Sequence, residues 1–236
     1  MSAIYNIGGD VLYETPQNIY PSFSMFKTFG VIGDSFASGE IYQSEGSTGV
    51  DYYDVSWPQI LARMAGVTAT NYSKGGLNTK TWLENADYGL AKLNGDTALG
   101  LYIIALGIND GNNSIPIGTI SDITSDSTNS FFSYYGRIVR AIKAHAPNAV
   151  IMLSTLARWT TRYNPYSDAI KSIGEYYTFP VFDLSESDFF QSTFFAENQI
   201  SNHPTAVNYS AMASEYKRLV EDELRKHPSA YAGYIG

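Results

Sequence analysis

The chain has 236 residues, of which 44% are hydrophobic and 16% charged, and its formal net charge at pH 7 is −8. This length and composition are typical of one soluble globular domain and exclude a disordered or fibrous protein. The acidic balance argues against nucleic acid and against an anionic membrane as partners, because both bind basic protein surfaces.

The absence of cysteine excludes disulfides, thiol catalysis and cysteine-ligated metal. No apolar run reaches the length of a membrane span. The start of the chain, Met1 to Asn6, lacks the basic residues and the long apolar run of a signal peptide, so a cytoplasmic location is the default expectation. The sequence makes no prediction about the oligomeric state.

Residues 1–25 contain turn signals such as Gly8-Gly9-Asp10 and Pro16 but no sustained periodicity. They are predicted to form an N-terminal arm that precedes one domain over residues 26–236. Within the domain, short apolar strands alternate with amphipathic helices, which implies a parallel sheet with right-handed crossovers. The predicted strands are residues 27–32, 67–72, 101–106, 150–153 and 181–182, and the predicted helices are 55–65, 79–94 (interrupted by Gly89), 131–142, 166–177 and 205–226.

Four short motifs lie where predicted strands end or where the last helix begins. The first, Gly33-Asp34-Ser35, follows the first strand abruptly, as expected of a side chain delivered to the carboxyl edge of a sheet. A serine held there can attack an ester if a base and an oxyanion site face it. The other motifs are Asn71-Tyr72-Ser73-Lys74-Gly75-Gly76, Gly107-Ile108-Asn109-Asp110 and His203-Pro204-Thr205-Ala206.

In this order, the four motifs resemble those of the GDSL/SGNH hydrolases, a family of serine esterases and acylhydrolases. The resemblance spans roughly residues 27–226, and Phe36 stands where the family name has leucine. It implies a three-layer α/β/α sandwich of the flavodoxin-like type, in the α/β class, with a five-stranded parallel sheet in the order 2-1-3-4-5.

The resemblance implies that Ser35 is the nucleophile and His203 its base. For Ser35 the competing interpretation is a helix N-cap. His145 and His227 lie at predicted helix ends, where a cation is stabilised by the helix dipole, so His203 is the best candidate for general base catalysis.

An oxyanion hole would be completed by three donors: the N–H of Ser35, the N–H of Gly76 and the side-chain amide of Asn109. Glycine permits the close approach or unusual backbone angles that such a loop needs. Gly75 is a possible substitute for Gly76, although the spacing from Asn71 favours Gly76. Asn109 taken alone could equally be a turn residue.

The chain departs from the family at Ile200, where an aspartate usually stands three residues before the histidine. Isoleucine cannot accept the imidazole N–H. Either a backbone carbonyl orients His203, or Glu197 or Asn202 does so. We favour a Ser35–His203 dyad oriented by the main chain. The loss of the correct tautomer costs a serine-protease triad about 10⁴ in rate, and a compensated dyad loses less.

The sequence therefore predicts a serine esterase that works through an acyl-enzyme without a cofactor. The chain has two acidic clusters, Asp122/Asp126 and Asp183/Glu186/Asp188. They lack the ligand spacing of a metal loop, so no metal is expected either.

Trp57, Trp82 and Trp159 are predicted near the rim of the site. If they lie there rather than in the core, they favour short acyl groups such as acetyl on carbohydrate as substrates.

The sequence is compatible with two alternatives. Within enzymes, the chain could be a lipid or thioester acylhydrolase, since the family acts on carboxylic esters broadly. From another class, it could be a non-catalytic carbohydrate-binding or particle-assembly module, because a fold alone does not fix activity. The replacement of the aspartate by Ile200 and the N-terminal arm motivate this second alternative.

Overall fold

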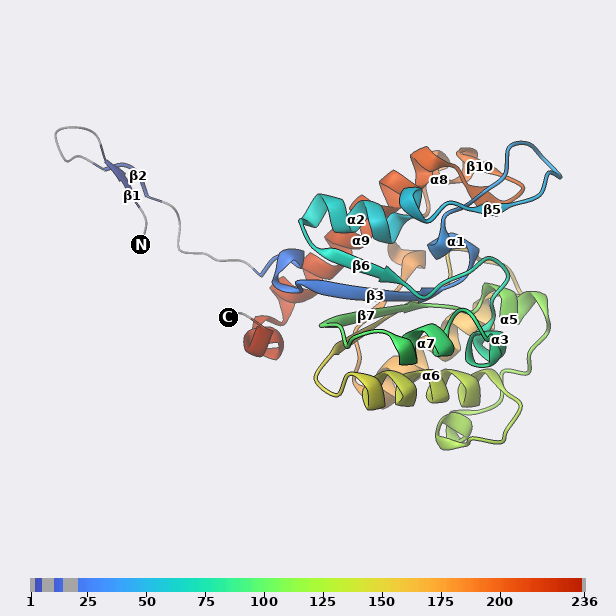
Figure 1. The fold of residues 1–236 in the computed structure, drawn as a ribbon. Coiled ribbons are helices and arrows are strands. Elements are labelled where there is room, and N and C mark those ends of the chain that lie inside the picture. Colours follow the sequence, from blue (N-terminus) through green and yellow to red (C-terminus); the bar gives the residue numbers. More distant parts are fainter. Residues whose placement is uncertain (1–2, 6–10, 15–20, 235–236) are drawn as a thin grey trace.

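A computed structural model describes residues 3–5, 11–14 and 21–234 (Figure 1). Its centre is a five-stranded parallel sheet in the spatial order β6-β3-β7-β8-β9. Numbered along the chain this order is 2-1-3-4-5, so the predicted topology is confirmed. The strands are β3 (Thr28–Gly33), β6 (Thr68–Asn71), β7 (Leu101–Ala105), β8 (Val150–Ser154) and β9 (Val181–Phe182).

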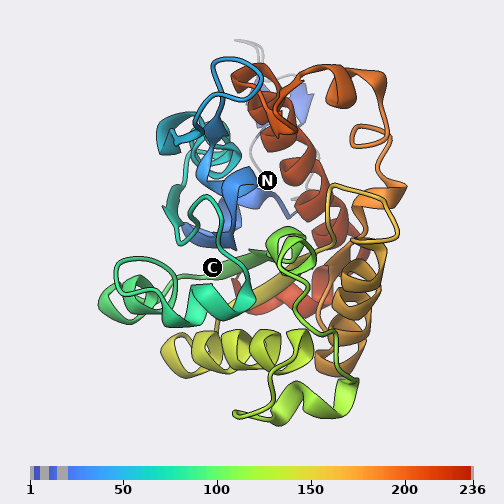
Figure 2. The ribbon, with the colours of Figure 1, turned by 90° about the vertical axis from the view of Figure 1, so that its right-hand side faces the viewer.

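Helices cover both faces of the sheet and make three layers (Figures 1 and 2). α2 (Trp57–Ala65) and α9 (Ala206–Lys226) pack together on one face. The other face carries α3 (Thr79–Glu84), α4 (Leu90–Gly95), α6 (Phe131–His145) and α7 (Asn164–Tyr177).

Gly89 divides the predicted helix 79–94 into α3 and α4. Its φ is +62°, and a Cβ there would lie 2.2 Å from the carbonyl oxygen of Trp82. Only glycine tolerates that combination, so the interruption is built into the sequence.

Short elements make up the rest of the described domain. β4 pairs antiparallel with β5, and β10 pairs antiparallel with β11. Both hairpins escaped prediction, because two-residue strands leave no periodicity to detect. These elements are η1 (Phe23–Met25), α1 (Ser35–Ser38), β4 (Glu40–Ile41), β5 (Val50–Asp51), η2 (Tyr53–Val55), α5 (Ile108–Asn112), η3 (Ile120–Thr124), η4 (Leu184–Glu186), α8 (Thr193–Glu197), β10 (Gln199–Ile200), β11 (His203–Pro204) and η5 (Pro228–Tyr234).

The predicted N-terminal arm lies partly outside the described residues, since residues 1–2, 6–10 and 15–20 are not among them. Within it, β1 (Ala3–Tyr5) and β2 (Val11–Glu14) pair antiparallel. Phe23 is fully buried and packs edge-on against Phe29, with ring centroids 4.9 Å apart. The core thus extends into the last residues of the arm, and the boundary at residue 25 stays a prediction.

Trp57 and Trp82 are core residues, each at most 1% exposed. The Trp57 ring stacks on Tyr216 at 4.0 Å, and Trp82 donates its indole N–H to the carbonyl oxygen of Tyr72 at 2.8 Å. The prediction that these two tryptophans lie at the rim is therefore wrong, because each finds a buried partner for its ring or its N–H. Trp159 is only partly buried.

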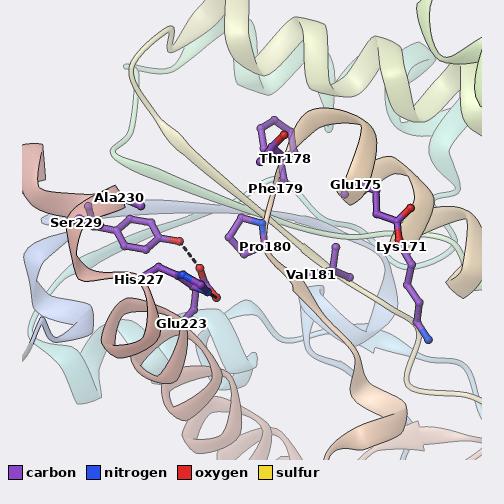
Figure 3. A pocket seen from close by; sticks show the side chains of 12 residues that line it. Lys171, Glu175, Thr178, Phe179, Pro180, Val181, Glu223, His227, Ser229 and Ala230 are labelled. Carbon is purple, nitrogen blue, oxygen red and sulfur yellow. Dashed lines mark hydrogen bonds and ion pairs between the residues drawn. The ribbon is translucent and has the colours of Figure 1, made fainter.

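A cavity of about 670 Å³ lies where α7, β9 and the end of α9 meet (Figure 3). Its lining includes Lys171, Glu223, His227 and Tyr231, and the Tyr231 hydroxyl donates to Glu223. The cavity is at the end of α9 opposite to the motif residues, a helix length of about 30 Å away. None of the described helices combines the length and the apolar composition of a bilayer crossing.

Candidate active site

Ser35 is the first residue of α1, directly after the turn that ends β3. The turn is tight, since a Cβ on Gly33 would lie 2.6 Å from that of Ala37. Asp34 stabilises the loop by accepting the N–H of Phe36 at 3.0 Å. The Tyr209 hydroxyl donates to the Ser35 carbonyl oxygen at 3.1 Å. These contacts fix the position of the serine, which is 5% exposed.

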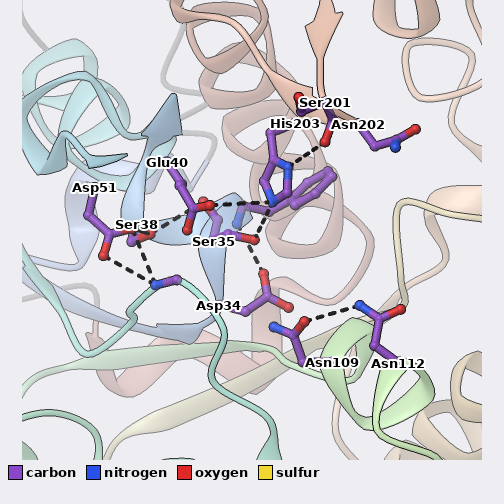
Figure 4. Close-up of polar contacts among 12 residues, drawn as sticks. Asp34, Ser35, Ser38, Glu40, Asp51, Asn109, Asn112, Ser201, Asn202 and His203 are labelled. Atoms are coloured by element: carbon purple, nitrogen blue, oxygen red, sulfur yellow. Dashed lines mark hydrogen bonds and ion pairs between the residues drawn. The ribbon is translucent and has the colours of Figure 1, made fainter. Parts of the chain in front are cut away.

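His203 lies directly against this serine (Figure 4). Its Nε2 is 3.0 Å from the Ser35 Oγ, although the two residues are 168 positions apart in the chain. Phe36 and Tyr42 flank the imidazole, with ring centroids 5.7 and 4.7 Å from it. The structure therefore brings together the predicted nucleophile and the predicted base at hydrogen-bonding distance.

The second imidazole nitrogen, Nδ1, is 2.9 Å from the carbonyl oxygen of Ser201. With Nδ1 protonated, it donates to that oxygen and leaves Nε2 free to accept the serine proton. Both hydrogen-bonded nitrogens of the ring have other partners than the side chains of Glu197 and Asn202, which are exposed. The main-chain partner is thus the one the structure provides, and the two side-chain candidates are not.

Glu197→Gln is expected to leave turnover within several-fold of the wild type, because the carboxylate does not touch His203. Steady-state hydrolysis of an activated ester checks this. A collapse of kcat in the variant would contradict an imidazole oriented by Ser201.

Burial is the main influence on the pKa of His203 and lowers it from its ordinary value. Four groups modify this effect. The hydrogen bond to Ser201 and the carboxylates of Glu40 and Asp51 raise the pKa, whereas Arg158 lowers it. The Glu40 Oε1 is 3.9 Å from Nε2. The imidazole is neutral near pH 7 and can accept a proton.

The acid limb of kcat/KM is accordingly expected below about pH 6.5, the pKa of a free imidazole. Activity requires neutral His203, so it is lost as the pH falls through the lowered pKa and is retained above it. A pH profile of ester hydrolysis measures this limb. A limb above that of free imidazole would contradict the dominance of burial.

Two backbone N–H groups near Ser35 have no hydrogen-bond acceptor within the described part of the chain: those of Ser35 and Gly76. Gly76 has a φ of +81°, which glycine adopts freely. The neighbouring Gly75 N–H is taken by the two carboxylate oxygens of Asp51, each at 3.2 Å. Of these two glycines, Gly75 has its N–H occupied by Asp51 and Gly76 does not.

Asn109 lies in the first turn of α5 and is tied to the Gly76 loop. Its Nδ2 donates one hydrogen to the Leu77 carbonyl oxygen at 3.0 Å, which leaves its second hydrogen for an oxyanion. Asn112 donates to the Asn109 Oδ1 at 3.2 Å and so fixes the direction of the amide (Figure 4).

Two buried carboxylates support these loops. The Asp110 carboxylate accepts the N–H of Thr79 at 3.1 Å and thereby joins α5 to α3. Burial raises the pKa of Asp110 to about 6 and that of Asp34 to about 7. Asn71 donates to the Ala37 carbonyl oxygen at 2.7 Å and joins β6 to α1. These residues hold the site rather than face it.

Sequence reasoning missed Glu40 and Arg158. Arg158 follows β8, lies over the Phe36 ring at 5.4 Å and donates to the carbonyl oxygen of Asn202. Neither residue belongs to a motif or to a periodic segment, so no sequence signal marks them. Over the described residues, no group of three or more His, Asp or Glu side chains is arranged to hold a metal ion.

Comparison with known families gives one match. The sequence pattern of the GDSL-like lipase/acylhydrolase family matches residues 31–211, which span β3 to the first turns of α9. Among proteins with curated descriptions, none matches the chain significantly in sequence.

Solved structures share the fold at low identity. A protein from Bacteroides uniformis described as GDSL-like lipase is 17% identical with a TM-score of 0.61, over 84% of this chain and 96% of that one. A family two carbohydrate esterase from Clostridium thermocellum, solved with cellohexaose, is 14% identical with a TM-score of 0.56, over 92% and 68%. A family two carbohydrate esterase with a carbohydrate-binding domain from Corynascus thermopiles is 15% identical with a TM-score of 0.59, over 92% and 70%.

Proposed function

The chain belongs to the GDSL-like lipase/acylhydrolase family and is a hydrolase, and from this premise we propose that it is a serine esterase with Ser35 as nucleophile and His203 as base. The observation that carries the proposal is the 3.0 Å contact between Ser35 Oγ and His203 Nε2, with Nδ1 held by a carbonyl oxygen. This pairing also argues against a non-catalytic module, which has no need of it.

In the first half-reaction, the Ser35 Oγ attacks the ester carbonyl carbon while His203 Nε2 takes the hydroxyl proton. The oxyanion that forms accepts hydrogen bonds from the Ser35 and Gly76 N–H groups and from the Asn109 amide. Collapse of the intermediate breaks the bond to the alcohol oxygen, which takes the proton from His203. The acyl group remains on Ser35.

In the second half-reaction, water replaces the alcohol. His203 takes a proton from the water as its oxygen attacks the acyl-enzyme, and the same donors stabilise the second oxyanion. Release of the carboxylic acid returns the proton to Ser35. No step requires an electron transfer, so the side chains and backbone N–H groups of this site, together with water, are sufficient for the reaction.

The proposed substrates are short acyl esters, above all acetyl esters, of carbohydrates. Ser35 is 5% exposed and lies beside Phe36, His203 and Tyr42, an arrangement that favours a small acyl group. Two of the proteins with the same fold are named as carbohydrate esterases. Trp159, the one tryptophan not in the core, is a candidate for sugar contact.

We expect the wild type to hydrolyse p-nitrophenyl acetate and to lose activity as the acyl chain is lengthened. Release of acetate from acetylated oligosaccharides, measured alongside, tests the alcohol side of the substrate. Ser35→Ala is the control for background hydrolysis. Activity that rises towards long acyl chains would assign a lipid acylhydrolase instead, and equal rates in wild type and Ser35→Ala would overturn the esterase.

A further inference from the structure

The turn that joins β10 to β11 carries a strained backbone next to His203. Ser201 and Asn202 have φ values of +49° and +59°, and Ile200 pairs with His203 across the turn. A two-residue hairpin of type I′ requires positive φ at both central residues, which favours Asn-Gly and penalises a serine. The local sequence therefore does not favour this turn, and contacts from other segments must stabilise it.

The segment between β4 and β5 holds the turn from one side. Glu45 accepts the Ser201 N–H at 2.8 Å and the Ser201 hydroxyl at 3.3 Å. The N–H of Gly46 in turn donates to the Ser201 Oγ at 2.9 Å. Ser201 thus has its N–H and its hydroxyl satisfied by residues about 155 positions earlier in the chain.

Arg158 holds the turn from the other side, because its guanidinium donates to the Asn202 carbonyl oxygen. The Ser201 carbonyl group lies between the hydrogen bonds of Glu45 and that of Arg158, and it accepts the Nδ1–H of His203 (Figure 4). A continuous series of contacts results, from Glu45 to Ser201 at 2.8 Å, from Ser201 to His203 at 2.9 Å, and from His203 to Ser35 at 3.0 Å.

We propose that Glu45 is a positioning residue for the Ser35–His203 pair, which holds the Ser201–Asn202 turn so that the Ser201 carbonyl fixes the imidazole. The inference rests on the proposed function. It assigns to Glu45, through the main chain, the orienting task that Ile200 cannot perform. Glu45 touches no reacting atom and acts only through Ser201.

Three substitutions at Glu45 separate position from charge. Glu45→Gln keeps an acceptor at the same reach, so kcat is expected within about threefold of wild type. Glu45→Asp keeps the charge but is one methylene shorter, and Glu45→Ala removes the group. Both are expected to lower kcat about 10- to 100-fold with little change in KM, because the imidazole is misplaced rather than substrate binding lost. Glu175→Ala, exposed on α7, controls for the loss of one negative charge.

The pH profile of kcat/KM distinguishes a misplaced imidazole from general destabilisation, because general destabilisation would not shift its acid limb. The Ser201 hydrogen bond raises the pKa of His203, so its loss is expected to move the acid limb of kcat/KM to lower pH in Glu45→Ala and Glu45→Asp. The other groups that act on the ring stay in place. They are Glu40, Tyr42 and Asp51 around the β4–β5 hairpin and Arg158 after β8.

A rescue experiment tests the turn directly. The double substitution Ser201→Asn/Asn202→Gly supplies the Asn-Gly pair that type I′ turns prefer and keeps the carbonyl at position 201. Placed in the Glu45→Ala background, it is expected to restore most of kcat. The proton resonance of His203 Nδ1–H gives a measurement independent of activity. It is expected to be sharp in wild type and broadened by exchange in Glu45→Ala.

The outcomes separate this inference from the proposed function. Wild-type rates in all three Glu45 variants, with Ser35→Ala inactive, would overturn the positioning role and leave the esterase intact. A loss in Glu45→Gln with full activity in Glu45→Asp would show a charge effect and would also overturn it. If Glu45→Ala does not fold, the Gln and Asp pair decides. A wild type without Ser35-dependent hydrolysis would remove both proposals together.

Discussion

Replacement of His203 by alanine is expected to lower kcat for ester hydrolysis about 10⁶-fold, the loss seen when the base or the nucleophile of a serine protease is removed. The physical reason is that Ser35, with no acceptor at 3.0 Å from its Oγ, remains a neutral hydroxyl at neutral pH. Single-turnover and steady-state assays with p-nitrophenyl acetate measure the loss. The acid limb of the pH profile should disappear with the imidazole.

His227→Ala is the matched control, since it removes an imidazole of which 61% is exposed at the end of α9. It is expected to retain wild-type kcat and the wild-type acid limb. A His203→Ala enzyme within about tenfold of wild type would show that another group accepts the serine proton and would end the dyad.

Asn109→Ala is expected to lower kcat about 10²- to 10³-fold, as the removal of one oxyanion donor does in other serine hydrolases. The amide hydrogen that does not bind Leu77 is the one available to the developing anion. KM for the ester should change little, because that anion is absent from the ground state. Stopped-flow measurement of acylation locates the loss in the chemical step.

Asn113→Ala makes the same chemical change in the adjacent turn. Its side chain donates to the Asn109 carbonyl oxygen at 2.7 Å and is exposed to solvent. Turnover within about threefold of wild type is expected for this control. Equal effects of the two substitutions would mean that Asn109 acts on the stability of α5 and not on the oxyanion.

The regular part of the fold follows from local pattern. Continuous apolar residues predict β7 and β8, because strands covered on both faces have no polar face to show. The helical spacing of Phe131, Tyr135 and Ile138 predicts α6, and the three residues are buried. The motifs predict the approach of Ser35 and His203, since parallel strands place their carboxyl ends at one edge.

The rest of the site could not be predicted because it depends on contacts between distant short segments. Glu45 and Ser201 meet through hairpins of two-residue strands, which have no periodicity. The approach of Arg158 to Asn202 depends on a loop conformation. The rim position predicted for Trp57 and Trp82 is wrong for a related reason. An isolated aromatic residue has the same sequence signature in a core and at a rim.

The position of α9 has a consequence for synthesis of the protein. The ribosome makes β3 and Ser35 early, whereas His203 and the helix that carries Tyr209 come in the last seventh of the chain. Glu221 of this helix accepts the N–H of Phe23 at 3.2 Å, so the two ends of the domain close on each other. A nascent chain that stops before His203 carries a serine without its base. Hydrolytic activity therefore requires the segment from His203 through α9, and its onset reports that this segment has closed on β3.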